Sequence, residues 1–254
     1  MHRIMVLAKA TMLENARKQV FHVVTLITLT IVCASTMLSF FTLGVQVKML
    51  KDLCMTSLLF CGGLLAVALA STSLPNEIEN KTCYPILARP IRRTELLLGK
   101  YLGSLITVYL GLAAISIVFA ALLAAKQALD SNLIISVGFI FLEVAVIAAV
   151  STCLSTFTTP AIAAMLSFII YVAGTIKMGY FKPLVDQVTN PAAGLLARIA
   201  YHMLPNLESF NFKDALVHNL NVPSSYLVQV AIYGVLYCAL MLTIGSYAFS
   251  RREL

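Results

Sequence analysis

Six long apolar runs limit what this chain can fold into. They extend over Phe21–Leu43, Leu53–Leu74, Tyr101–Ala125, Leu133–Phe157, Pro160–Ile176 and Tyr226–Phe249. Most approach or exceed the roughly 20 residues that an α-helix needs to cross a bilayer, and the fifth is the shortest because Lys177 ends it early. Backbone polar groups in lipid must be paired inside the chain, which a helix achieves by itself. The runs therefore predict an all-α membrane protein with six transmembrane helices.

Composition and the pattern within the runs support the same fold class. Hydrophobic residues make up 60% of the chain and charged residues 11%, against about 25% charged residues in a soluble domain. The runs lack the alternating polarity of a transmembrane β-strand. We expect residues 1–254 to form a single transmembrane domain surrounded by lipid.

The placement of basic residues predicts the topology. Bases are dense in the N-terminal segment, in the loop 75–100 and at the C-terminus, and short cytoplasmic loops carry an excess of Lys and Arg. Both termini are therefore expected in the cytoplasm, with residues 177–225 on the outer side. The net charge of +7 is attributed to this topology, so no nucleic-acid partner is expected. These features fit a multi-pass membrane protein, and the bacterial plasma (inner) membrane is its expected location.

The N-terminal segment 1–19 has the pattern of a helix that lies on the inner membrane face. Its apolar positions are expected to face lipid, and they are Ile4, Leu7, Ala8, Met12 and Ala16. Anchoring to lipid headgroups is the favoured role, with contact to a partner protein as the alternative.

The loop 75–100 carries five of the eighteen basic residues and three of the eleven acidic residues. Glu77 and Glu79 fall near the start of a short helix, where the helix dipole favours acidic side chains. The Arg89-Pro90 pair predicts a turn, because the residue before proline avoids the α region. A second helix is expected to begin near Ile91 and to continue into the third span. The loop would then be an arm joined rigidly to a transmembrane helix, unless its bases serve only to fix topology.

A row of small residues follows this arm. Gly99, Gly103, Thr107 and Gly111 recur every four residues, and such rows let helix backbones approach closely. Packing within the chain is favoured over dimerisation as the reason for this row.

The outer segment 177–225 contains signals for structure of its own. Asn190 before Pro191 predicts the start of a helix that runs to Leu204. Asn211 and Asp214 have the spacing of a capping box for a second short helix. Apolar residues here favour a position at or inside the outer interface. A sealing lid and an exit gate are equally compatible with the pattern.

Several kinds of chemistry have no motif in the chain. Gly99-Lys100 lacks the remaining residues of a phosphate-binding loop, so ATP hydrolysis by this chain is not expected. The four histidines form no recognisable ligand set and no hydrolase motif is present, so neither a metal site nor an enzyme is predicted. The six cysteines include no C-x-x-C pair and are interpreted as small buried hydrophobes.

Glu143 is the one acidic residue deep inside a span. A charged side chain at the bilayer centre costs about 2.5–3.5 kcal/mol on insertion scales, so Glu143 should face the bundle interior and pair with a hydroxyl, a base or water. A polar clamp between helices is favoured. Proton coupling and contact with a cationic substrate are the functional alternatives.

Several segments together resemble the permeases of ABC-2 type transporters, in particular the subgroup described as multicopper-enzyme-maturation permeases. In the cytoplasmic loop the similar pieces are Glu77–Thr82, Leu87–Pro90, Arg93–Glu95 and Gly99–Lys100. Three further pieces also resemble segments of this family and follow in the same order along the chain, namely Leu154–Pro160, Leu204–Phe210 and Phe249–Leu254.

This resemblance implies a permease that pairs with a second permease copy, identical or not, and with two separate ATPase subunits. The ATPase would dock on the loop between spans two and three, with ATP and magnesium on the ATPase and no cofactor on this chain. The candidate docking or arm-shaping residues are Glu77, Glu79, Lys81, Thr82, Arg89 and Arg93. Export is the commoner direction in the family.

The substrate is not predicted, since the family handles drugs, lipids, polysaccharides, peptides and ions. The ten methionines fit packing better than a copper path. Two alternatives to an ABC permease are a self-sufficient secondary transporter or channel, which usually shows an internal repeat, and a membrane scaffold or assembly factor.

Overall fold

The structure is a computed structural model that describes residues 2–37, 43–79, 93–128, 132–177, 201, 204–213, 217 and 223–251. Within these ranges the regular elements are helices, which confirms the all-α prediction. The α-helices are α1 (His2–Ala16), α2 (Gln19–Ala34), α3 (Leu43–Ser73), α4 (Pro75–Glu79), α6 (Arg93–Ala125), α7 (Asn132–Ser155), α8 (Pro160–Thr175) and α12 (Ser224–Arg251). Two short 3₁₀ helices are η1 (Ser35–Met37) and η3 (Glu208–Phe210).

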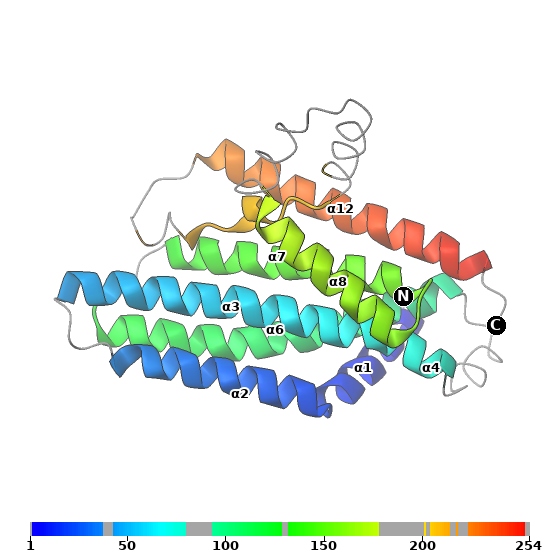
Figure 1. The fold of residues 1–254 in the computed structure, drawn as a ribbon, viewed down its shortest axis with the longest axis horizontal. Coiled ribbons are helices and arrows are strands. Elements are labelled where there is room, and N and C mark those ends of the chain that lie inside the picture. The colour runs from blue at the N-terminus through cyan, green and yellow to red at the C-terminus, as the bar shows by residue number, and fades with distance from the viewer. Residues whose placement is uncertain are drawn as a thin grey trace, which may run out of the picture.

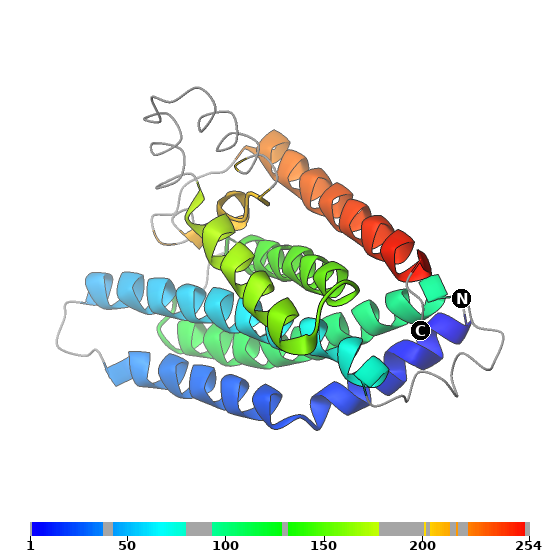
Figure 2. The same ribbon diagram turned by 45° about the vertical axis from the view of Figure 1, so that its right-hand side comes forward.

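The long helices form one elongated bundle. Helices α2, α3, α6 and α7 run along its length, with α8 against α3 and α7 and with α12 against α7 and α6 (Figure 1). The start of α1, helix α4, the start of α6 and the end of α12 lie at the same end (Figures 1 and 2). We call this the arm end, since it carries the root of the predicted arm. The other end is called the opposite end.

Four of the described helices are long and apolar enough to cross a membrane, namely α3, α6, α7 and α12. Helices α1 and α2 meet the same criteria only as a pair bent by 65°, which gives up to five spans among the described residues. Helix α8 is apolar but has only 16 residues, in agreement with the short fifth run. The chain is thus a multi-pass helical protein, and the count of six spans stays a prediction.

Two helices differ in extent from the apolar runs. Helix α3 starts at Leu43, ten residues before its run, and polar residues in its first turns have partners. Gln46 accepts a hydrogen bond from Lys126 at 3.4 Å, and Asp52 forms an ion pair with Lys213 at 3.3 Å. Helix α2 ends at Ala34 instead of continuing to Leu43, and the Ser35 hydroxyl bonds back to a carbonyl of the last turn.

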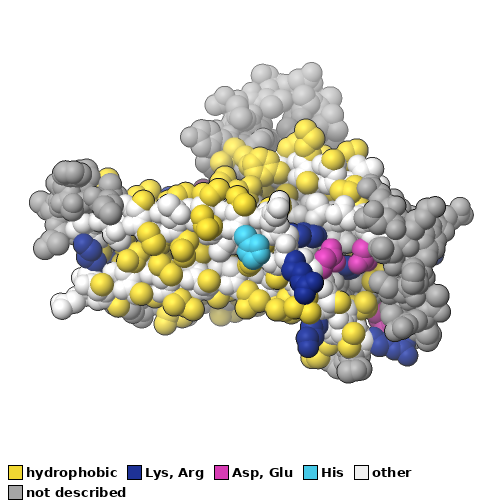
Figure 3. Space-filling view, turned by 90° about the horizontal axis from the view of Figure 1, so that it is seen from below, with side chains coloured by type: hydrophobic (Ala, Val, Ile, Leu, Met, Phe, Trp, Pro, Cys, Tyr) yellow, Lys and Arg dark blue, Asp and Glu magenta, His cyan; other side chains and the backbone are white. Residues whose placement is uncertain are grey.

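The N-terminal helix does not present its predicted apolar side to lipid. Ala8 is buried, and the side chain of Leu7 lies at Gly99 of α6. The apolar side chains that α1 leaves exposed are Met5, Val6 and Leu13. The prediction is therefore corrected: much of the apolar side of α1 packs on α6. Figure 3 shows hydrophobic side chains over the middle of the face formed by this part of the bundle, with most of its charged side chains toward the arm end.

Residues 204–213 fold into the opposite end of the bundle. Leu207, Phe210 and Phe212 are buried in the core. The Lys177 ammonium donates to the carbonyl of Leu204 at 2.6 Å. The apolar side of this segment therefore packs into the bundle, and its predicted position at the outer membrane interface stays a prediction.

The two helices predicted in the outer segment are only partly within the described ranges. Asn211 accepts a hydrogen bond from the Lys213 backbone at 3.2 Å, which agrees with a capping role, while Asp214 lies outside the described residues. Most of the predicted helix Pro191–Leu204 lies outside them as well. The choice between a lid and a gate stays open.

Candidate functional site

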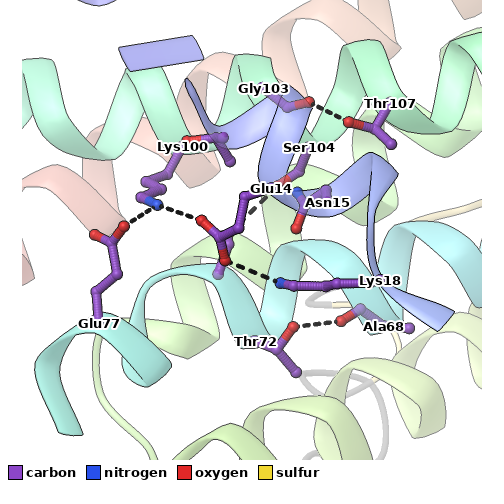
Figure 4. Close-up of polar contacts among 12 residues, drawn as sticks. Glu14, Asn15, Lys18, Ala68, Thr72, Glu77, Lys100, Gly103, Ser104 and Thr107 are labelled. Atoms are coloured by element: carbon purple, nitrogen blue, oxygen red, sulfur yellow. Dashed lines mark hydrogen bonds and ion pairs between the residues drawn. The ribbon is translucent and has the colours of Figure 1, made fainter. Parts of the chain in front are cut away.

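The root of the arm is tied to the bundle by a cluster of charged side chains. The Lys100 ammonium on α6 contacts the carboxylates of Glu77 on α4 and Glu14 on α1, the latter at 3.4 Å (Figure 4). Glu14 also pairs with Lys18 at 3.4 Å, one turn further along the chain. We call Glu14, Glu77 and Lys100 the joint, because they connect three helices at one point.

Lys100 is the buried centre of the joint. Its side chain is 4% exposed, against 16% for Glu77 and 43% for Glu14. Removing an ammonium from water costs several kcal/mol unless carboxylates face it closely. The fold meets this requirement by placing α4 and α1 on two sides of Lys100. The position of the first arm helix and the position of α6 are therefore linked through one charge.

Hydrogen bonds below the joint hold α1 on the bundle. The Asn15 amide donates to the Ser104 hydroxyl at 3.1 Å, and Ser104 lies 3.4 Å from the hydroxyl of Ser73 on α3. The Thr107 hydroxyl is 2.9 Å from its own helix carbonyl at Gly103. These buried polar contacts bring α1, α3 and α6 together beneath the arm (Figure 4).

Two glycines allow α1 to come this close to α6. A Cβ atom built at Gly103 would lie 2.5 Å from the Thr11 Cβ and 2.6 Å from the Ala8 carbonyl oxygen, and one at Gly99 would lie 2.6 Å from the Leu7 Cβ. The row of small residues on α6 therefore serves packing inside the chain, as favoured from the sequence. The helix that covers it at this end is α1.

Arg93 connects the start of α6 to the last helix. Its guanidinium donates to the carbonyls of Phe249 and Ser250, each at 3.2 Å. A cation there also complements the negative end of the α12 dipole. This contact makes Arg93 a brace between two helices and places it differently from a residue exposed on the arm for docking.

The other predicted site residues are only partly covered by the structure. Glu79 ends α4, and its side chain is outside the described set, while Lys81, Thr82 and Arg89 lie outside the described residues altogether. Sequence reasoning missed Glu14 and the central role of Lys100. The position of Lys100 in the sequence was the available signal. Lys100 directly precedes the apolar run Tyr101–Ala125, and a base beside such a run needs an acidic partner.

Glu143 lies inside the bundle, as predicted for an acid within a span. It is 2% exposed near the middle of α7, where α7 packs against α3 and α8. Neither carboxylate oxygen has a hydrogen-bond partner among the described residues, so the expected pairing with a hydroxyl or a base is not found there. The clamp, proton coupling and contact with a cationic substrate all stay predictions.

The described ranges hold no group of three or more His, Cys, Asp or Glu residues placed to bind a metal ion. His202 and His218, which share the outer segment, lie outside those ranges. Among the described residues, the joint brings ionisable side chains from three helices into contact.

A family model described as "ABC-2 family transporter protein" matches residues 4–254. The chain belongs to the ABC-2 transporter family. Its match extends over the joint, all the described helices and the opposite end. No curated protein matches the chain. The match is to the family as a whole, so the multicopper-enzyme-maturation subgroup stays a prediction.

Membership of the family assigns this ABC-2 permease to one kind of transporter subunit. It is the membrane-spanning permease subunit of an ABC transporter, and the family implies an ABC ATPase as a partner. The loop that contains α4 is the arm that the resemblance assigns to ATPase docking. In this permease the root of that arm rests on Lys100.

Proposed function

We propose that a separate ATPase subunit docks on residues 75–92 of this permease and drives it by pushing on the joint. The observation that carries the proposal is the contact of Lys100 with Glu77 and Glu14, which links the first arm helix to α6 and α1. ATP and magnesium would bind to the ATPase, and the permease would supply the arm and the pathway.

The proposal divides the candidate residues into two groups. Glu77 shapes the arm, since its carboxylate is held by Lys100, and Arg93 braces α6 on α12. Glu79, Lys81, Thr82 and Arg89 are the candidates for direct contact with the ATPase. Closure of the ATPase dimer would displace α4, and the joint would pass that displacement to α6.

The assembly follows from the same proposal. Two copies of the permease, identical or different, would enclose the pathway, with α2 and α8 completing six spans in each copy. The arm end would face the cytoplasm of a bacterial cell, in keeping with its density of basic residues. Export is the proposed direction.

Purification of the tagged permease from its native membranes tests the proposal. We expect an ATPase subunit to co-purify and ATP hydrolysis to be found in the complex. Reversing charge at Glu79 and Arg89 should abolish co-purification, whereas Lys9→Glu on the exposed side of α1 should leave the complex intact. Membrane fractionation would check that every variant inserts.

Two outcomes contradict the proposal at different points. An intact complex in the variant with Glu79 and Arg89 reversed would show that these arm residues do not form the docking contact. Transport by the purified chain in vesicles without ATP would show that the protein works as a secondary transporter, so that no ATPase drives it.

A further inference from the structure

Two grooves flank the last turns of α12 at the arm end. The first has a volume of about 390 Å³ and lies between α12 and the start of α6, where it is lined by Thr94, Leu98, Leu242, Ser246 and Tyr247. The second has a volume of about 430 Å³ and lies toward the turn after α7, where it is lined by Phe157, Ile244, Tyr247, Ala248 and Arg251. The grooves are similar in size and lie on two sides of one helix.

Tyr247 is the residue that the two grooves share. Its side chain is 60% exposed, and the Arg251 guanidinium lies over the ring at 4.6 Å from its centroid. A cation thus lies between the grooves, at the end of the bundle where α12 stops. A guanidinium stacked on an aromatic ring keeps its edge available for hydrogen bonds to a phosphate.

Arg251 is the one charged residue that lines either groove within the described part of the chain. Neither groove is lined by an Asp or Glu within the described residues, and a second guanidinium, that of Arg93, lies at the adjacent carbonyls of Phe249 and Ser250. This environment favours an anion. Tyr and Arg are also common at the level of lipid headgroups.

The outward side of α12 above the grooves is apolar. Val235, Leu236 and Leu240 are exposed there, and α12 is the least buried of the four long helices. An occupant must therefore combine a negative head with apolar parts that lie along a helix in contact with lipid. A water-soluble partner would have no reason to cover such a surface.

We propose that these grooves hold an anionic phospholipid, with its phosphate on Arg251 and one acyl chain on each side of Tyr247. The shape of the site matches a ligand with one head and two tails, and its charge selects against a zwitterionic lipid. The first groove shares Thr94 and Leu98 with the loop 75–100, whereas Arg251, which would hold the phosphate, lies on α12 outside that loop.

Native mass spectrometry of the permease in detergent, with phosphatidylglycerol or phosphatidylcholine added, tests the proposal. We expect phosphatidylglycerol to be retained preferentially and Arg251→Glu to weaken its retention by at least about fivefold, the effect of removing one base from a lipid surface. Lys48→Glu, at an exposed base on α3 away from the grooves, is the control and should bind as the wild type does. Thermal unfolding would check that both variants are folded.

A second variant keeps the charge and removes the space. Ser246→Trp fills the groove next to α6 and should reduce retention of phosphatidylglycerol with Arg251 still present. Equal retention by Arg251→Glu and the wild type, or equal retention of the two lipids, would overturn the proposal. A photo-cross-linker at position 247 that captures the ATPase or a second permease copy instead of lipid would overturn it too.

Discussion

The two ends of the bundle are held together by different interactions. At the arm end, α1, α4 and α6 meet through ion pairs on Lys100 and through hydrogen bonds among small polar side chains. At the opposite end, Phe210 and Phe212 are buried against α7 and α12, beside the bond from Lys177 to the Leu204 carbonyl. Close-packed rings resist displacement, whereas the contact of Lys100 with the partly exposed Glu14 can break at small cost while its buried contact with Glu77 remains. Under the proposed function, the arm end would move during transport, and the opposite end would stay closed until later.

The largest effect on stability is expected from the ring packing at the opposite end. Phe210→Ala removes a fully buried ring that packs near Tyr233 and should lower the free energy of unfolding by about 3–5 kcal/mol. Denaturant unfolding in detergent would measure it. Phe60→Ala, at a ring more than half exposed on α3, is the control and should cost much less. Equal losses would show that the opposite end is not held by this packing.

A smaller and asymmetric effect is expected within the joint. Glu77→Ala leaves the buried Lys100 with only the partly exposed Glu14 and should cost about 1.5–3 kcal/mol, the range for hydrogen bonds to charged groups. Glu14→Ala leaves the more buried contact to Glu77 in place and should cost less than about 1 kcal/mol. The same unfolding measurement compares them, and a reversed order would contradict Lys100–Glu77 as the main contact.

The packing of α1 on α6 gives the third prediction. Gly103→Ala places a methyl group against the Ala8 carbonyl and should cost about 1–3 kcal/mol, because a backbone atom cannot move aside easily. Gly138→Ala on α7 is a matched control, since a Cβ there has no atom within 4 Å and alanine favours the helix. Melting temperatures of the two variants should differ in this direction. Two equally stable variants would mean that α1 does not depend on this close approach.

Much of the fold could be predicted from the sequence, because lipid leaves few alternatives for an apolar run. The helical class, the short α8 ending near Lys177 and the continuation of the arm into α6 all follow from run length and helix signals. The row from Gly99 to Gly111 predicted close packing correctly. Its partner helix could not be predicted, since periodicity shows which face is small and does not show what covers it.

The joint was harder to predict for a related reason. Glu14 and Lys100 are 86 positions apart, and only the fold of α1 onto α6 brings them together. Arg93 was a docking or arm-shaping candidate from the family resemblance, whereas its hydrogen bonds to α12 depend on the place where that helix ends. The charge pattern along the chain indicated that the loop 75–100 is important. It could not predict which side chains pair in the joint, because those pairs depend on tertiary contacts.

The central claim is that ATP-driven movement of the arm reaches α6 through Lys100. Spin labels at the exposed positions Ile117 on α6 and Leu236 on α12, in a background without native cysteines, would measure this movement in the complex with its ATPase. The distance between the labels should change on ATP binding in the wild type and in the control Lys126→Met. It should stay fixed in Lys100→Met, although the complex still forms. An unchanged ATP response in Lys100→Met would contradict the account.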